Sequence, residues 1–229
     1  MREILDLDFD SKLFGYKIGK VTLNETGLYI PEFIEEAKRY KLVYIFSNSE
    51  LDKLNLNIID KKVILSTQLT GNYYLPDSVV PFDHKAHSYE QLQELALQSG
   101  IYSRFNTDPN FTNNEYLNLY LRWLKQSING TSAFEINVIS EQGKLAGFIT
   151  VGETNKDTAN IGLLAVSDIY KGKGYGTRLI QKALNTSSEK GYRNLEVVTQ
   201  MQNIPALTLY QKMGFKIKTT TNIYHYWNI

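Results

Sequence analysis

Apolar and polar residues alternate over several short stretches of the first seventy residues. Lys17–Leu23 alternates with the period of a strand, while Leu42–Ser47 and Lys62–Leu69 have the apolar, β-branched composition typical of strands. Pro31–Lys41 begins with proline and repeats apolar residues at helical spacing, which predicts a helix. Leu51–Ile59 predicts a second, shorter helix. The first part of the chain is therefore predicted to be of the α/β type.

The periodic pattern is lost over Asn72–Ser88, which holds two prolines. We interpret this stretch as a linker between two domains, a smaller α/β domain over 1–87 and a second domain over 88–229. The succession strand, loop, Leu-rich helix and strand occurs over Tyr44–Leu69 and again over Leu195–Thr221. This similarity fits a partial copy of the second domain's fold in the first, and it fits a chance match of common patterns equally well.

The second domain begins with two helical patterns. Each helical pattern follows a pair of residues with the spacing of a capping box, Ser88 with Gln91 for the first and Thr112 with Glu115 for the second. A polar loop over Ile101–Phe111 lies between the two patterns. Three strands, a helix, a strand, a helix and two strands then follow, an order that indicates a mixed α/β fold. The expected strands are Ala133–Ser140, Leu145–Val151, Thr158–Val166, Leu195–Thr199, Lys216–Thr221 and Ile223–Trp227, and the expected helices are Gly174–Lys190 and Ile204–Met213.

Composition narrows the classes of function. The 25 Lys and Arg against 24 Asp and Glu give a formal charge of +1, which indicates neither a nucleic-acid nor a membrane partner. The absence of Cys excludes a disulfide scaffold, a Cys-ligated zinc site and a thiol nucleophile. No apolar run approaches the roughly 18 residues of a membrane-spanning helix, and the first ten residues lack an apolar signal core. We therefore expect a soluble, cytoplasmic protein.

A glycine-rich stretch over 171–177 follows an apolar strand and opens a helix. Its three alternate glycines leave backbone N–H groups at a helix N-terminus, where the helix dipole favours a phosphate. The spacing fits neither a P-loop nor a Rossmann fingerprint, and a turn without a ligand is the alternative. The stretch consists of Lys171, Gly172, Lys173, Gly174, Tyr175, Gly176 and Thr177.

A second pattern follows the next strand. Asn203, Ala206, Tyr210, Gly214 and Phe215 occupy every fixed position of N-x-x-A-x-x-x-Y-x-x-x-G-F. With the glycine stretch before it, this pattern resembles the GNAT superfamily of acyl-CoA-dependent N-acyltransferases. The resemblance covers residues 88–229 and implies a GNAT fold with a splayed sheet, with acetyl-CoA as the acyl donor and no metal.

In that family the pattern (Q/R)-x-x-G-x-(G/A) binds the pyrophosphate of coenzyme A. Gly174 and Gly176 match it, whereas Lys171 stands where the family has Arg or Gln. Lysine keeps the positive charge but lacks the planar, bidentate geometry of arginine. The resemblance implies that 171–177 and Asn203 bind the coenzyme, Asn203 being equally suited to cap a helix.

The resemblance also implies how the acyl group is held and transferred. The backbone of Leu164, Ala165 and Val166 would pair with the pantetheine arm near the thioester carbonyl. Tyr210 would contact the coenzyme and protonate the departing thiolate, since a phenol with a pKa of about 10 stays protonated at neutral pH. A tyrosine packed in the core is the alternative. Glu196 is the candidate general base, with Glu153 or ordered water as alternatives.

A narrower resemblance concerns the acceptor. Tyr102–Phe105, Ile161–Val166, Val198–Asn203 and Asp10–Gly15 are similar to GNAT enzymes that acetylate the 4-amino group of dTDP-linked 4-amino-4,6-dideoxy sugars. Arg104 would then bind the nucleotide pyrophosphate, or it forms a loop salt bridge instead. Acetylation of a protein N-terminus and a non-catalytic acyl-CoA-binding module are the alternative functions. A homodimer is compatible with the sequence, which does not determine the oligomeric state.

Overall fold

The computed structural model describes residues 3–23, 30–51, 56–71 and 73–228. The strands are β1 (Leu5–Asp6), β2 (Ile18–Leu23), β3 (Leu42–Ser47), β4 (Asp60–Gln68), β5 (Val80–Pro81), β6 (Glu135–Glu141), β7 (Lys144–Asn155), β8 (Thr158–Val166), β9 (Asn194–Gln200) and β10 (Lys216–Trp227). The helices are α1 (Asp8–Phe14), α2 (Ile30–Ala37), α3 (Tyr89–Ser99), α4 (Arg104–Thr107), α5 (Glu115–Ile128), α6 (Tyr175–Glu189) and α7 (Ile204–Lys212). In the described part of the chain, no helix is long and apolar enough to cross a membrane.

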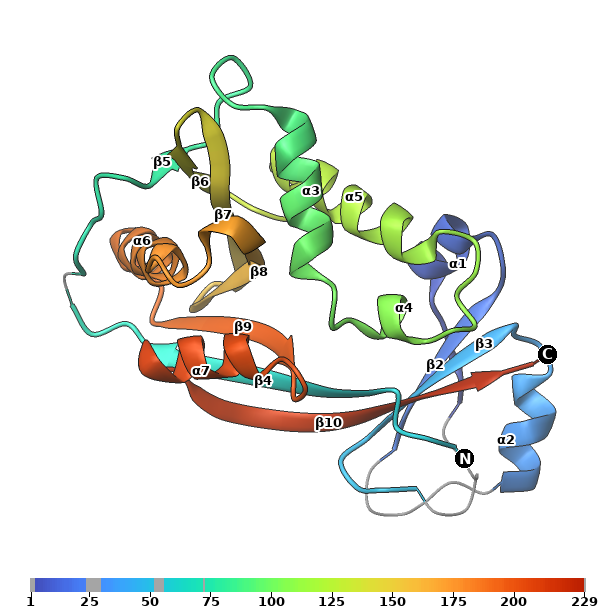
Figure 1. Cartoon of the computed structure of the whole chain (residues 1–229). Coiled ribbons are helices and arrows are strands. Elements are labelled where there is room, and N and C mark those ends of the chain that lie inside the picture. Colours follow the sequence, from blue (N-terminus) through green and yellow to red (C-terminus); the bar gives the residue numbers. More distant parts are fainter. Residues whose placement is uncertain (1–2, 24–29, 52–55, 72, 229) are drawn as a thin grey trace.

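All ten strands belong to one mixed, mostly antiparallel sheet, in the order β1-β2-β3-β10-β4-β9-β8-β7-β6-β5. Its two faces are covered by different helices, as Figure 1 shows. Leu179 and Ile180 of α6 and Leu207 of α7 pack on one face, in the largest core cluster. Leu92 of α3 and Leu124 of α5 pack on the other face. The predicted mixed α/β fold is confirmed.

Strand β4 joins the first part of the chain to the same sheet as the last part. It comes before residue 87, yet it lies between β9 and β10, which come near the end of the chain, and pairs antiparallel with both. Strand β3, also from the first part, pairs with the other edge of β10. The two predicted domains therefore share one sheet, and their division at residue 87 stays a prediction.

Several expected elements are confirmed. The β6–β7 hairpin forms as expected, and α6 ends just before Gly191, whose φ of +83° is the left-handed conformation that favours glycine after a helix. The Ser88 hydroxyl caps α3 by accepting the backbone N–H of Gln91. The Gln91 side chain completes no capping box, because its Oε1 accepts the N–H of Leu145 instead.

Other expectations are wrong. Thr112 does not cap α5, since that helix begins at Glu115, whose carboxylate accepts the N–H of Asn113. The loop over Ile101–Phe111 contains the short helix α4. The two C-terminal strands are one strand, β10, because its polar middle pairs with β4. The predicted linker contributes β5, a two-residue edge strand beside β6.

The predicted helix over Leu51–Ile59 falls partly on residues 52–55, which lie outside the described residues. The part that is described, Leu51 and 56–59, is not helical.

Candidate functional site

The site begins where two parallel strands separate. Strand β8 pairs with β9 only over Thr158–Ile161, and beyond that point no pair joins the two strands in the described structure. A bulge lies at the separation, because Ile161 and Leu164 on β8 oppose Val151 and Ile149 on β7 with one extra residue between them. The following segment of β8, from Gly162 to Val166, therefore has backbone groups on the β9 side that no strand uses.

Side chains satisfy part of this distorted backbone. The N–H of Leu163, at the bulge, donates to the Thr150 hydroxyl at 2.8 Å. The carbonyl of Val166 accepts the side-chain amide of Gln98 at 3.0 Å, and the same amide donates to Asp168. The splayed sheet expected from the family resemblance is thus present, and its open edge offers hydrogen-bonding groups to an extended ligand.

One cavity, which we call the loop cavity, runs from this open edge to the N-terminus of α6 and has a volume of about 450 Å³. It gathers most of the residues predicted to bind the coenzyme. These are Leu164, Ala165, Val166, Lys171, Gly172, Gly174, Tyr175, Gly176, Thr177 and Asn203. Two of the predicted coenzyme-binding residues, Lys173 and Tyr210, are not among the lining residues of this cavity. The ammonium of Lys173 is paired with Glu141 at 2.9 Å.

The backbone of the glycine stretch adopts a conformation that favours glycine at two positions. Gly172 and Gly174 have φ angles of +80° and +79°, in the left-handed region that favours glycine. Gly174 is the N-cap of α6 and brings no side chain to satisfy the first N–H groups of the helix. These donors and the helix dipole fit a phosphate group at this end of the loop cavity. The Lys171 side chain is instead paired with Asp168 at 2.5 Å.

We expect the backbone, and not the lysine, to dominate coenzyme binding here. Gly174→Ala places a Cβ on a left-handed residue, which costs about 1–2 kcal/mol and should weaken coenzyme A binding about tenfold as the loop relaxes. Lys171→Met should weaken it less than threefold, because an exposed ion pair contributes about 0–1 kcal/mol. Calorimetric titration with coenzyme A measures both. An equal loss in the two variants would assign the phosphate contact to the Lys171 side chain.

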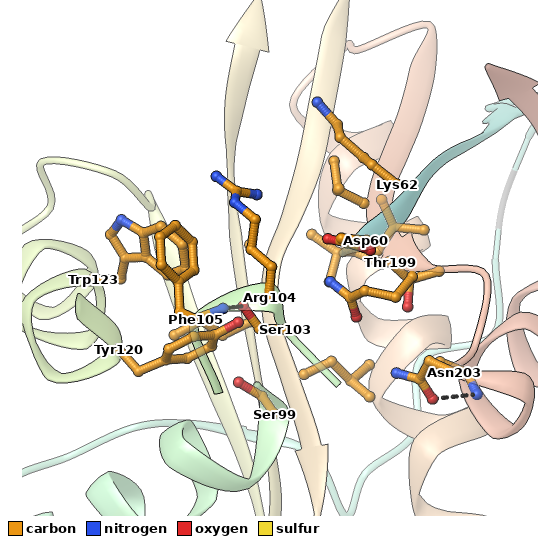
Figure 2. Close-up of a pocket in the computed structure, with 18 of the residues that line it drawn as sticks. Asp60, Lys62, Ser99, Ser103, Arg104, Phe105, Tyr120, Trp123, Thr199 and Asn203 are labelled. Carbon is orange, nitrogen blue, oxygen red and sulfur yellow. Dashed lines mark hydrogen bonds between the residues drawn. The ribbon is translucent and has the colours of Figure 1, made fainter. Parts of the chain in front are cut away.

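A second cavity, which we call the inner cavity, adjoins the first and has a volume of about 230 Å³. The two share Ser99, Leu164, Asn203 and Ala206 in their linings. The inner cavity draws its other walls from both halves of the chain (Figure 2). They include Asp60 and Lys62 of β4, Ser103, Arg104 and Phe105 around α4, Tyr120 and Trp123 of α5, Gln200 of β9 and Tyr210 of α7.

Asn203 lines both cavities, whereas Tyr210 lines the inner cavity alone. Tyr210 lines the inner cavity with only 4% of its surface exposed, and burial raises the pKa of its phenol well above the usual value of 10. The phenol therefore stays protonated and able to donate at neutral pH. Asn203 caps α7, since its Oδ1 accepts the N–H of Ala206 at 3.2 Å, and it also lines both cavities. The position of Asn203 is thus compatible both with capping the helix and with binding the coenzyme.

The structure does not bring Glu196 to the cavities. Its carboxylate is paired with Lys218 at 2.6 Å, and it does not belong to the lining of either cavity. The alternative, Glu153, accepts the hydroxyl of Tyr192 at 2.6 Å and also lies outside both linings.

Asp60 is the carboxylate that does line the inner cavity, and sequence reasoning missed it. It is 3% exposed, and within the described part of the chain its Oδ1 has no hydrogen-bond partner. Burial raises the pKa of Asp60 to about 6, against the opposing charges of Arg104 and Lys62. A carboxylate with a pKa near neutrality is suited to take a proton from a reacting group.

Arg104 reaches the same cavity from α4. Its guanidinium lies 4.9 Å from the ring of Tyr44 and 4.3 Å from that of Phe105. Its Nε is buried without a hydrogen-bond partner, and it forms no salt bridge within residues 3–23, 30–51, 56–71 and 73–228. The structure thus places Arg104 at the inner cavity, without the loop salt bridge that was its alternative, and its binding of a pyrophosphate stays a prediction.

Known proteins are similar to this chain in sequence and in fold. The acetyltransferase (GNAT) family model matches residues 90–215. The chain is 27% identical to dTDP-fucosamine acetyltransferase of Escherichia coli over 96% of this chain and 95% of that protein. It is 28% identical to the spore coat polysaccharide biosynthesis protein SpsD of Bacillus subtilis over 60% of this chain, which spans 47% of SpsD.

A solved structure extends the likeness to the whole fold. A conserved protein of unknown function from Staphylococcus epidermidis superposes on the full chain with a TM-score of 0.69 at 12% identity, over 92% of that protein. The family match spans the glycine stretch, the open strand edge and the motif around Tyr210. The chain belongs to the GNAT family of acetyltransferases and is an acetyl-CoA-dependent N-acyltransferase.

Proposed function

We propose that the chain transfers the acetyl group of acetyl-CoA directly to a primary amine on a small molecule, the amino group of a nucleotide-linked amino-deoxy sugar. The observation that carries this proposal is the adjoining pair of cavities. The loop cavity has the backbone features that fit the coenzyme, and the inner cavity holds a buried carboxylate and a buried phenol beside it.

The donor would lie along the open edge of β8. The N–H groups at the start of α6 would bind its pyrophosphate, with Asn203 beside the coenzyme arm. The backbone of Leu164, Ala165 and Val166 would pair with the pantetheine arm in place of a neighbouring strand. This pairing would direct the thioester toward the inner cavity, since Leu164 lines both.

The inner cavity would supply the proton transfers. Asp60 would accept the proton that the amine nitrogen loses as it attacks the thioester carbonyl. Backbone donors near Leu164 and Ala165 would stabilise the negative charge on the carbonyl oxygen. As the carbon–sulfur bond breaks, Tyr210 would give its proton to the departing thiolate. The sequence contains no cysteine that could carry the acetyl group, so the transfer would be direct, in a ternary complex.

Two observations support a sugar acceptor. The relative from Escherichia coli, aligned over nearly the full length of both chains, is named for acetylation of dTDP-fucosamine. The inner cavity also has an aromatic wall, formed by Phe105, Tyr120 and Trp123, opposite polar groups on β4 and β9. Aromatic faces with a few convergent polar groups are typical of small-molecule sites.

The test is release of coenzyme A from acetyl-CoA in the presence of a panel of amines. The panel pairs dTDP-4-amino-4,6-dideoxyhexoses with N-terminal peptides and free polyamines. Turnover with the dTDP sugars alone supports the proposal. Turnover with peptides would favour N-terminal acetylation, and acetyl-CoA binding without turnover on any amine would favour a binding module.

A further inference from the structure

Two cations line one end of the inner cavity, and a third lies behind them. Lys62 and Arg104 both line it, and Figure 2 shows their side chains extending to the same end, away from Ser99 and Asn203. Lys20 lies close behind, because its ammonium is 4.5 Å from the ring of Phe46 and the guanidinium of Arg104 is 5.9 Å from the same ring. Ser99 and Asn203 line both cavities, so the cationic end is the one opposite the loop cavity.

These cations are poorly compensated. No salt bridge within 4.0 Å involves Lys20, Lys62 or Arg104 among the described residues. The charge of Arg104 acts on two carboxyl groups, Asp60 and Asp10, but burial still raises the pKa of both. Burial and the charges of Arg104 and Lys20 together lower the pKa of Lys62. A bound anion would relieve this mutual repulsion.

We propose that Lys62 and Arg104, with Lys20 behind them, form a binding site for a phosphate or diphosphate group of the acceptor. This inference rests on the proposed function, and it adds Lys62 and Lys20 to the acceptor site and places the anion at the end opposite the coenzyme.

The side chains present match phosphate chemistry. The planar fork of Arg104 can hold two oxygens of one phosphate, and the ammonium of Lys62 acts as a point charge that a neighbouring oxygen can approach from several directions. Arg104 has its Nε buried and free of any partner within the described residues, so one donor is already available.

The size of the inner cavity fixes how such an acceptor would lie. A volume of about 230 Å³ is below the roughly 300–1,000 Å³ of most ligand pockets. The cavity would therefore enclose only the amine-bearing part, next to Asp60 and Tyr210. Lys20 and Lys62 are partly exposed, so a group attached to the bound phosphate would extend past them toward solvent.

The test uses inorganic pyrophosphate as the probe, titrated calorimetrically into protein saturated with coenzyme A in buffer without divalent metal. Saturation with coenzyme A occupies the phosphate site at α6 and leaves the cationic end as the one under test. Lys62→Met is expected to raise the Kd of pyrophosphate at least tenfold, because one charge-assisted contact is lost. Lys61→Met is the matched control, since Lys61 is absent from the cavity lining and successive strand residues point to opposite faces. It should change the Kd less than twofold.

Unchanged coenzyme A affinity in both variants shows that they fold. The subsite is overturned if pyrophosphate does not bind the coenzyme-loaded protein, or if Lys62→Met binds it as tightly as the unmodified chain does. The two proposals fail separately. Lys62-dependent pyrophosphate binding without acetylation of any amine would leave the subsite standing and remove the sugar-amine function. Equal turnover of an amino sugar and its dTDP conjugate, unaffected by Lys62→Met, would leave the sugar-amine function standing and remove the phosphate subsite.

Discussion

Replacing Asp60 with Asn is expected to lower kcat for amine acetylation about 100-fold and to remove the acidic limb of the kcat/KM pH profile. The carboxylate accepts a proton only when ionised, so activity of the unmodified enzyme should rise with pH through about 6, the raised pKa of Asp60. Loss of a general base typically costs 10²- to 10⁴-fold, and the lower end applies if water takes over part of the role. Steady-state kinetics from pH 5 to 9 measure both effects.

Glu196→Gln is the matched control, because it also exchanges a carboxylate for an amide on a neighbouring strand. Its carboxylate is paired with Lys218 outside the cavities, so kcat and the acidic limb should both be retained. If the acidic limb of the pH profile remained in Asp60→Asn and disappeared in Glu196→Gln, Glu196 would be the general base, as the sequence predicts.

Stability separates loss of chemistry from loss of folding in Asp60→Asn. Because burial raises the pKa of Asp60 from 3.8 to about 6, the fold prefers the protonated acid. That preference contributes stability fully below pH 3.8 and is lost as the pH rises through about 6. An uncharged Asn removes the cost of the buried charge above that range. The free energy of unfolding at pH 7.5 should therefore be unchanged or higher, as urea denaturation would show.

Replacing Tyr210 with Phe is expected to lower kcat about 100-fold while the Kd for acetyl-CoA changes less than threefold. The substitution removes only the hydroxyl, and the ring keeps its contact with Phe215, whose centroid lies 5.7 Å away. A thiolate that departs without a proton is a poorer leaving group, so the loss should appear in kcat. Turnover and calorimetric binding of acetyl-CoA separate the two quantities.

Tyr192→Phe serves as the control for Tyr210→Phe. The hydroxyl of Tyr192 donates to Glu153, and neither residue lines either cavity. This variant should retain full turnover. Unchanged turnover in Tyr210→Phe would remove the tyrosine from the mechanism, and a large loss of acetyl-CoA affinity would make it a binding residue instead.

The parts of the site that sequence reasoning found are those encoded by short, contiguous patterns. The glycine stretch predicts a loop that leaves backbone N–H groups at the start of a helix, and α6 begins directly after Gly174, its N-cap. The spacing of Asn203 and Tyr210 places one at the N-cap and the other within the same short helix, and both line the inner cavity. Such features depend on residues close in sequence, so the local pattern is sufficient to predict them.

The acceptor end could not be predicted in this way. Asp60 and Lys62 reach the inner cavity because β4 lies between β9 and β10, more than a hundred residues away along the chain. In the sequence, Asp60 is a single acid before an apolar strand, a common arrangement on protein surfaces. The sequence favours Glu196 as the general base because it lies on the strand next to β8, but its carboxylate is paired with Lys218. Long-range strand pairing decided which acid lines the cavity.

The position of β4 also has a consequence for the order of folding. One of its two neighbours, β10, follows every GNAT motif residue in the sequence, so the coenzyme-binding part can form while β4 still lacks that neighbour. Contacts between segments so distant in sequence form slowly, because loop-closure entropy opposes them. The wall that carries Asp60 and Lys62 would therefore be secured last, when β10 enters the sheet. We expect a refolding chain to recover coenzyme A binding before it recovers acetylation of an acceptor.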